Sequence, residues 1–461
     1  VLSDVLPVIE NLGLHVLTEN PFRIQSTSGR TVFLHIFDLA DHDQRDIEIG
    51  KSKSDFERLF RRIWQGQTDN DGFNRLALRA QLDWQQTTFL RAAYRYLKQI
   101  RFRYSQDYVI ETLAGNPHMV QRIVRLFETR FDPGLQDERS GALETIRADI
   151  QQGLERVANL DEDRILSAYV NLIEAILRTN YFQQHNPQQP ERLSFKIDCA
   201  AITRMPQPRP MVEIFVFSTR VEAIHLRGGL VARGGLRWSD RPEDFRTEVL
   251  GLVKAQIVKN AVIVPVGSKG GFIVRRLADC APNERNEEVE SCYKTFIRGM
   301  LDLTDNRDHD SVIPPPRVVR YDQDDPYLVV AADKGTATFS DMANEVAAEY
   351  GYWLDDAFAS GGRTGYDHKA MGITARGAWE SVKRLFRDLD INTQTQPFSV
   401  VGIGDMSGDV FGNGLLLSRH IRLVGAFNHL HIFIDPNPDP AASYAERERL
   451  FQRPRSTWED Y

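Results

Sequence analysis

The sequence predicts an α/β protein of several domains, in which a helical N-terminal region precedes two α/β regions. Three observations predict this class. Apolar residues recur at helical spacing through residues 50–184, short β-like runs begin after residue 190, and a strand, a glycine-rich turn and a helix follow one another after residue 395. We therefore expect four parts, at residues 1–48, 50–184, 191–377 and 395–461.

The composition is that of an ordinary globular protein, with room for about two to four domains. The 461 residues are 42% hydrophobic and 26% charged, and the net charge is −7. Nucleic-acid-binding proteins usually carry a basic footprint, so this balance argues against one. The three cysteines are too few and too scattered for a disulfide framework, and they lack a metal-like spacing. We expect a cytoplasmic protein without a metal site.

The two ends of the chain suggest a piece of something longer. The start, Val1 to Leu6, lacks the basic region and apolar stretch of a signal peptide, and it lacks an initiator Met. The last pattern is cut off at Tyr461. No apolar run reaches the roughly 18 residues that a membrane helix needs, so we expect no membrane span.

Residues 1–48 predict a short helix and two strands. The helix carries an apolar stripe as far as Leu12, and the strands are expected at residues 15–18 and 31–37, with a turn at residues 26–30. A unit this small is either the tail of a regulatory-type module or a structural connector, and its residues favour neither.

Residues 50–184 predict a helical domain. The clearest apolar stripes lie at residues 56–63, 89–100 and 165–176. Such stripes usually form the core of a helix bundle, and no catalytic constellation accompanies them. We expect a scaffold or a subunit interface.

Cationic residues stand beside paired glycines between Ala232 and Phe272. β-like runs at 193–202, 211–217, 221–226 and 230–236 lead into this stretch. A helix over residues 243–258 places Gln256 and Lys259 on one face near its end, and a strand over 261–266 ends at a turn formed by residues 267–271. Glycines allow close approach of a ligand to the backbone.

Arg233, Lys259 and Lys269 are the cations of this stretch. Several cations that converge on a glycine-lined turn suit a small substrate with two carboxylates. Ordinary surface ion pairs are an equally good explanation of their spacing. Further along, an apolar strand ends at Asp333, which is either a carboxylate presented at a sheet edge or a helix cap.

A dinucleotide-binding pattern begins at Phe398. A strand leads to the glycines Gly402, Gly404 and Gly408, a helix follows, and a second strand at residues 430–434 ends at Asp435. The glycines allow a tight turn and close approach of a pyrophosphate to the helix start, and a carboxylate at Asp435 would bind the adenosine ribose and favour NAD over NADP. We therefore expect a partial Rossmann-like NAD domain.

The cationic stretch resembles the substrate-binding core of glutamate dehydrogenases, and most of all the large bacterial NAD-specific class. The resemblance rests on three segments in the same order, namely Arg233-Gly-Gly-Leu-Arg237, Gln256-Ile-Val-Lys259 and Gly267-Ser-Lys-Gly-Gly271. Compact members of the family carry Lys where this chain has Arg233.

The resemblance implies oxidative deamination of L-glutamate to 2-oxoglutarate and ammonium by an NAD-dependent homo-oligomer. It implies that Lys259 binds the α-carboxylate of the substrate and that Arg233 binds its side-chain carboxylate. Gln256 would lie beside them as a hydrogen-bonding partner. It makes Lys269 the catalytic lysine that activates water and Asp333 the residue that moves the amino-group proton. Thr374 would contact the nicotinamide, although a helix-capping role is an equal contender. The active site is expected in the cleft between the last two domains.

Two other functions stay open. Leucine and phenylalanine dehydrogenases of the same superfamily have an apolar residue in place of the cation that binds the side-chain carboxylate, so Arg233 favours glutamate unless it faces solvent. Alternatively, the fragment is a regulatory or assembly module that binds a ligand without turnover, because the chain ends before the nucleotide domain is complete.

Overall fold

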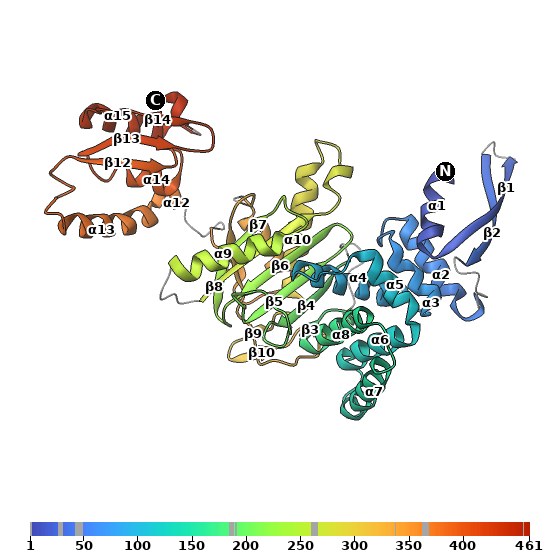
Figure 1. Cartoon of the computed structure of the whole chain (residues 1–461). Helices are drawn as coiled ribbons and strands as arrows, with labels where there is room; N and C mark the ends of the chain where they lie inside the picture. The colour runs from blue at the N-terminus through green and yellow to red at the C-terminus, as the bar shows by residue number, and fades with distance from the viewer. Residues whose placement is uncertain are drawn as a thin grey trace. The chain divides into compact units, whose positions relative to one another are not determined.

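The computed structural model describes residues 2–25, 31–41, 49–183, 189, 191–259, 266–336, 338–361, 368–454 and 456–461. The chain forms two compact units, residues 1–360 and 361–461. Both contain helices and β-sheet (Figure 1), and this confirms the predicted α/β multidomain class. None of the described helices is both long and apolar enough to cross a membrane.

The N-terminal segment contains the predicted helix and two strands. Helix α1 (Leu2–Asn11) precedes an antiparallel pair, β1 (Leu14–Gln25) and β2 (Thr31–Asp41). Both strands are longer than predicted. The predicted turn at residues 26–30 lies outside the described residues.

The predicted helical region is present. Its elements are α2 (Ile49–Trp64), η1 (Gly72–Arg75), α3 (Leu76–Arg79), α4 (Trp84–Gln99), α5 (Gln106–Gly115), α6 (Pro117–Phe131), α7 (Arg139–Leu154) and α8 (Leu160–Ala175). Local signals begin these helices: Asp83 and Gln86 form a capping box at α4, and Pro117 stands in the first turn of α6. The stripes pack inward, with Phe89 stacked on Phe127 at 3.8 Å between ring centroids.

A seven-stranded mixed sheet forms the centre of the first unit (Figure 1). Its strands are β3 (Ile176–Thr179), β4 (Leu193–Asp198), β5 (Val212–Phe217), β6 (Val221–Arg227), β7 (Ala232–Trp238), β8 (Val266–Val274) and β11 (Val329–Ala332), in the order β11-β7-β8-β6-β5-β4-β3. Strand β7 runs parallel to both of its neighbours, and the other pairs are antiparallel.

The two faces of this sheet are covered by different helices. Helices α4, α8 and α9 (Phe245–Lys259) pack on one face, in a core that includes Phe215 and Leu226. Helices α10 (Arg285–Leu301) and α11 (Ser340–Glu349) pack on the other, against Ile214 and Phe272. The short elements η2 (Leu277–Asp279), β9 (Asn306–Asp308), β10 (Ser311–Ile313) and η3 (Asp355–Ala357) complete the unit.

The prediction of a glycine turn at residues 267–271 was wrong. These residues lie inside β8, hydrogen-bonded between β6 and β7. Glycines usually weaken a strand, but here a side chain at Gly271 would lie 2.6 Å from Val249 of α9. Their small size lets the helix approach the sheet. The strand predicted at 261–266 lies outside the described residues except for Val266.

The second unit contains a three-stranded sheet with helices. Its elements are α12 (His368–Met371), α13 (Ile373–Arg387), β12 (Phe398–Ile403), α14 (Asp409–Gly414), β13 (Ile421–Phe427), β14 (Ile432–Ile434), α15 (Pro440–Gln452) and η4 (Trp458–Asp460). Strands β12 and β13 are parallel, whereas β14 returns antiparallel to β13. The sequence prediction missed β13 and treated β14 as the second strand of the nucleotide unit.

Candidate functional site

Cations and glycines alternate on the face of β7 and β8 that α9 covers. Arg233 pairs with Gly267 and Arg237 with Gly271 in the parallel register, and the same offset sets Lys269 beside Gly235. Because alternate residues of a strand point to the same face, all three cations share it. Each cation therefore has a neighbour without a side chain, and other parts of the chain pack closely into the space that a side chain would take there.

Close contacts require two of these glycines. A Cβ at Gly267 would lie 2.4 Å from the Gln256 side-chain amide, so Gln256 rests directly on the strand backbone. A Cβ at Gly235 would lie 2.9 Å from the Ala332 carbonyl and 3.0 Å from Cβ of Asp333. The glycines thus bring Gln256 of α9 and the end of β11 against the same strands as Lys269.

Asp333 is the acceptor at the centre of this cluster. It follows β11, and its carboxylate lies 3.3 Å from Lys269 Nζ and 3.1 Å from Arg237 Nη2 and accepts the backbone N–H of Lys334 at 2.7 Å. Burial alone would raise the pKa of Asp333. The Lys334 N–H and the two cations outweigh burial and hold that pKa below its ordinary value. Asp333 is therefore an ionised hydrogen-bond acceptor at neutral pH.

Arg237 is a site residue that was not predicted, although it belongs to the segment Arg233-Gly-Gly-Leu-Arg237. Arg237 also donates to Glu248 of α9 at 2.8 Å, and Glu248 accepts the Ser239 hydroxyl at 2.5 Å. Arg237 thus links the helix that carries Gln256 to the carboxylate of Asp333. The predicted strand ended at residue 236, whereas β7 extends to Trp238, and the even spacing of Arg237 from Arg233 places both on one face.

The start of α9 is fixed by a buried ion pair. Arg246, in the first turn, pairs with Glu213 of β5, and the Tyr96 hydroxyl donates to the same carboxylate at 3.0 Å. Arg246 and Glu213 are fully buried. This pair fixes the helix on the sheet, so the approach of Gln256 to Gly267 is built into the fold.

The remaining predicted substrate residues lie on the same two elements. Arg233 is exposed on β7, and among the described residues no ion pair or hydrogen bond involves its side chain. Lys259 is the last residue of α9, but its side chain lies outside the described part of the chain. The structure thus brings Lys269, Asp333 and Gln256 together and leaves Arg233 open at the strand start.

The second unit carries the glycine loop at the carboxyl end of β12. Gly404 has φ +135°, donates to the Phe427 carbonyl at 2.8 Å and accepts from the Trp458 indole at 2.8 Å. Gly408 begins α14 and contributes no side-chain cap, and a Cβ there would meet only the Asp405 carbonyl, at 3.5 Å. An uncapped helix start behind a tight glycine turn fits the phosphates of a dinucleotide.

Asp435 does not lie beside the glycine loop. Because β14 runs antiparallel to β13, Asp435 lies opposite Val424, back along the sheet from the strand ends. The carboxyl end of β13 instead carries Asn428, whose amide donates to Asp405 in the glycine loop at 2.8 Å. A carboxylate and an amide at the ends of two parallel strands are the groups expected to meet a ribose.

Thr374 is exposed in the first turn of α13. The helix is preceded by Gly372, in the left-handed region at φ +62°, and this residue rather than Thr374 occupies the cap position. The capping alternative for Thr374 is therefore wrong. A nicotinamide contact by its hydroxyl stays a prediction.

Comparison with known proteins covers the whole chain. A family model described as bacterial NAD-glutamate dehydrogenase, catalytic domain, matches residues 149–461. Models for glutamate dehydrogenase helical motif 3 and for its ACT3 domain match residues 68–133 and 1–52. A solved hetero-hexameric glutamate dehydrogenase from Thermus thermophilus, in its Leu-bound form, matches 58% of this chain and 57% of its own at 16% identity and a TM-score of 0.32.

Curated relatives match along the full length of the chain. NAD-specific glutamate dehydrogenases of Halomonas elongata, Pseudomonas aeruginosa and Mycobacterium tuberculosis are 58%, 55% and 53% identical to it. Each match covers 100% of this chain but only 28%, 29% and 29% of the relative. With these identities and a catalytic-domain model over residues 149–461, the chain belongs to the bacterial NAD-specific glutamate dehydrogenase family.

Proposed function

We propose that the full-length protein containing this chain converts L-glutamate, NAD⁺ and water into 2-oxoglutarate, ammonium, NADH and a proton. The observation that carries this proposal is the cluster of Lys269, Arg237 and Asp333 beside Gly235, where β7 and β8 meet the end of the edge strand β11. It combines an ionised acceptor with a lysine side chain, and these are groups that proton transfer during amine oxidation requires.

The substrate carboxylates are assigned to two cations outside the central cluster. Arg233, exposed and without a described partner, holds the side-chain carboxylate through two parallel hydrogen bonds. Lys259 holds the α-carboxylate, with Gln256 against Gly267 as a hydrogen-bonding neighbour. The exposure of Arg233 weakens the choice of glutamate over leucine or phenylalanine, so the amino-acid specificity rests on the family.

Proton transfer is assigned to the central pair. Asp333, ionised and 3.3 Å from Lys269, accepts a proton from the substrate ammonium group so that the amine lone pair can form the iminium. Lys269 orients and activates the water that attacks the iminium carbon. Ammonia then leaves and takes up a proton to become ammonium, and one further proton passes to solvent, which completes the balance.

The second unit is assigned to NAD. Gly402, Gly404 and Gly408 would hold the pyrophosphate at the start of α14, with Asp405 and Asn428 near the ribose and Thr374 toward the nicotinamide. When bound, NAD⁺ accepts the hydride from the substrate α-carbon. Asp435 has no part in this proposal because β14 carries it away from the loop.

Assembly and location follow the family in our proposal. We infer a homo-oligomer that uses residues 50–184 as scaffold or interface and works in the cytoplasm. The four-part division of the chain also stays a prediction. The non-catalytic alternative, a regulatory or assembly fragment, applies to the isolated chain rather than to the full-length protein.

Glutamate-dependent NADH formation by the full-length protein tests the proposal. Lys269→Ala and Asp333→Asn should each lower kcat by about 10²–10⁴, the usual contribution of acid–base groups. Lys334→Ala is the matched control, because Lys334 is exposed and contributes only its backbone N–H to Asp333. Full turnover in folded Asp333→Asn would contradict the catalytic assignment. Turnover of leucine but not glutamate would move the protein to the sibling enzymes.

A further inference from the structure

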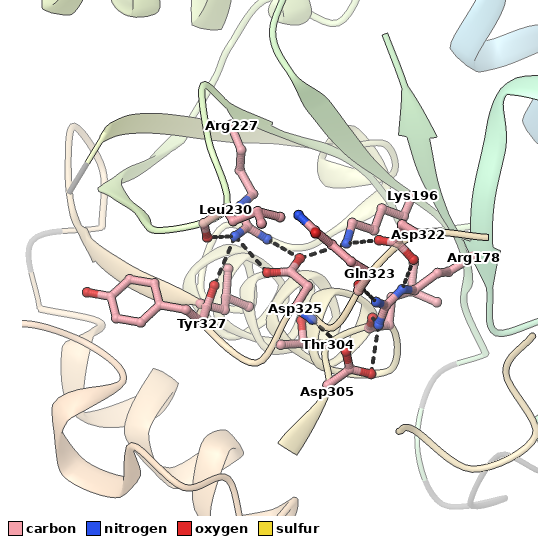
Figure 2. A network of polar contacts seen from close by, with 12 residues as sticks. Arg178, Lys196, Arg227, Leu230, Thr304, Asp305, Asp322, Gln323, Asp325 and Tyr327 are labelled. Atoms are coloured by element: carbon pink, nitrogen blue, oxygen red, sulfur yellow. Dashed lines mark hydrogen bonds and ion pairs between the residues drawn. The ribbon is translucent and has the colours of Figure 1, made fainter. Parts of the chain in front are cut away.

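Arg227, a fully buried residue of β6, holds the starts of two strands at once. Its Nη1 and Nη2 donate to the two carboxylate oxygens of Asp325 at 2.7 and 3.0 Å. Nη2 also donates to the backbone carbonyls of Leu230 and of Tyr327, the latter at 3.0 Å (Figure 2).

The two carbonyls occupy equivalent places in the chain. Leu230 lies two residues before the first residue of β7, and Tyr327 lies two residues before the first residue of β11. From there the strands run parallel, with Val329 opposite Arg233 and Ala332 opposite Leu236. One guanidinium therefore sets the point from which both strands begin.

This register decides where Asp333 lies. Strand β11 has four residues, stands at the edge of the sheet and pairs with β7 along that length. A slip by one residue would turn its side chains to the opposite face, and a slip by two would move Asp333 by about 6–7 Å. Either slip would separate Asp333 from Arg237 and Lys269.

A second buried arginine in the same network lacks this geometry. Arg178 of β3 is equally buried and binds Asp305, Asp322 and the carbonyls of Leu303 and Gln323 (Figure 2). Its contacts fix the loop that leads toward β11, as those of Arg227 do. They touch neither strand start.

We propose that Arg227 is a positioning residue for the reaction, acting through the register of β11 on the distance between Asp333 and Lys269. This inference rests on the proposed function. Arg227 lies behind the sheet from the cluster and touches no reacting atom. It acts by binding the carbonyls of Leu230 and Tyr327, and so it fixes the starts of β7 and β11 relative to each other.

The test compares Arg227→Lys with Arg178→Lys in the full-length protein. A lysine keeps the charge of each arginine but cannot bind a carboxylate in bidentate fashion and two carbonyls as well. Both variants should lose stability to a similar degree. Only Arg227→Lys should lower kcat, by about 10–100-fold, since a displacement of about 1 Å at a reacting group can cost about 100-fold.

The pH profile separates positioning from loss of stability. Asp333 faces Lys269 of β8, Arg237 of β7 with its partner Glu248 of α9, and the Lys334 N–H. Moving Asp333 away from the cations raises its pKa, so the acid limb of kcat/KM should shift to higher pH in Arg227→Lys and stay in place in Arg178→Lys. Faster amide hydrogen exchange in β11 should accompany the shift. If Arg227→Lys fails to fold, Asp325→Asn should give the same changes in smaller measure.

Each outcome decides one of the two proposals. Equal losses of kcat in the two lysine variants, with unshifted pH profiles, would overturn the role of Arg227. The proposed function would still stand in that case if Asp333→Asn shows its expected loss of kcat. Wild-type turnover in Asp333→Asn would overturn the proposed function and this inference with it. A shifted profile confined to Arg227→Lys supports both.

Discussion

Two charged clusters on opposite faces of the seven-stranded sheet differ in pairing and in burial. Along β6, Leu226 lies opposite Lys269 and Arg227 lies opposite Ser268, so Lys269 and Arg227 point to different faces. On the Arg227 face, three cations meet three carboxylates: Arg178, Lys196 and Arg227 with Asp305, Asp322 and Asp325 (Figure 2). The most exposed of these side chains, Asp322, is 13% exposed.

The cluster around Lys269 is more open and less balanced. Asp333 is shared by Lys269 and Arg237, whose side chains are 23% and 18% exposed, and Arg233 is exposed beside them. A balanced, buried network holds chain segments together, because every charge already has its counterion. A face with an unmatched cation and glycines between its charges suits a ligand that brings its own carboxylates. The comparison teaches that pairing and burial, more than charge itself, separate a structural cluster from a binding one.

The largest expected effect lies on the buried face. Asp305 is fully buried and accepts from Arg178 at 2.8 Å and from the Asp325 backbone N–H at 2.7 Å. Asp305→Ala removes one of the two carboxylates that Arg178 binds and leaves the Asp325 backbone N–H without its acceptor, so the free energy of unfolding should fall by about 3–5 kcal/mol. Denaturant unfolding of the full-length protein measures this. Asp244→Ala, which removes one partner of an exposed pair with Arg241, is the control and should change little. Equal stability of the two variants would contradict the role given to burial.

The difference between the faces also separates what the sequence could predict from what it could not. The helices of residues 50–184 and strands β4 to β7 follow from periodicity, because their apolar residues repeat at 3.6 or 2 residues. Lys269 and Asp333 were singled out with the help of local motifs. Their contact at 3.3 Å joins residues 64 positions apart, and no spacing in the sequence predicts it.

The buried network had no sequence signal at all. Arg178, Lys196, Arg227 and Asp325 come from separate strands and a loop, and each alone reads as an ordinary surface charge. The glycines of β8 were read as a turn because glycine is usual there, whereas the close approach of α9 requires them in a strand. The direction of β14 was also not predictable, because nothing in the sequence of residues 430–434 indicates that this strand returns antiparallel to β13.

A smaller effect is expected on the open face, and it concerns rate rather than folding. Arg237→Met removes one of the two cations from Asp333 and frees Glu248 from its ion pair. The pKa of Asp333 should rise, since fewer cations then favour its ionised form, and the acid limb of kcat/KM should move to higher pH. We expect kcat/KM at neutral pH to fall by about 10–100-fold, which is at most the low end of the about 10²–10⁴-fold contribution of an acid–base group, because Asp333 itself remains.

The control for Arg237→Met is Arg241→Met, which removes an exposed arginine just beyond the same strand. It should leave the pH profile in place. Arg237→Lys keeps a cation near Asp333 and should recover part of the shift. An unshifted profile in Arg237→Met, with lower activity, would mean that Arg237 acts on the substrate rather than on Asp333.

The smallest expected effect concerns His225, which lies on the same face of the sheet as Arg227 but takes no part in the buried ion-pair network. His225 of β6 is fully buried, and neither ring nitrogen has a hydrogen-bond partner among the described residues. Burial, and next the charge of Arg227, lower its pKa to about 3. The folded chain therefore keeps His225 neutral, whereas the unfolded chain binds a proton below about pH 6.5. This contribution to stability is complete above that pH and is lost as the pH falls toward 3.

His225→Leu removes this titration and keeps an apolar group of similar size between β5 and β8. Between pH 7.5 and 5, the wild-type free energy of unfolding should fall by about 1–2 kcal/mol more than that of the variant. Urea unfolding at the two pH values measures the difference, and the carboxylates of the network cancel because both proteins contain them. His309→Asn, at a histidine that is 96% exposed, should behave as wild type. If His225→Leu shows the wild-type pH dependence, the histidine is solvated or paired in solution, and the Arg227 face is less completely buried than its ion pairs indicate.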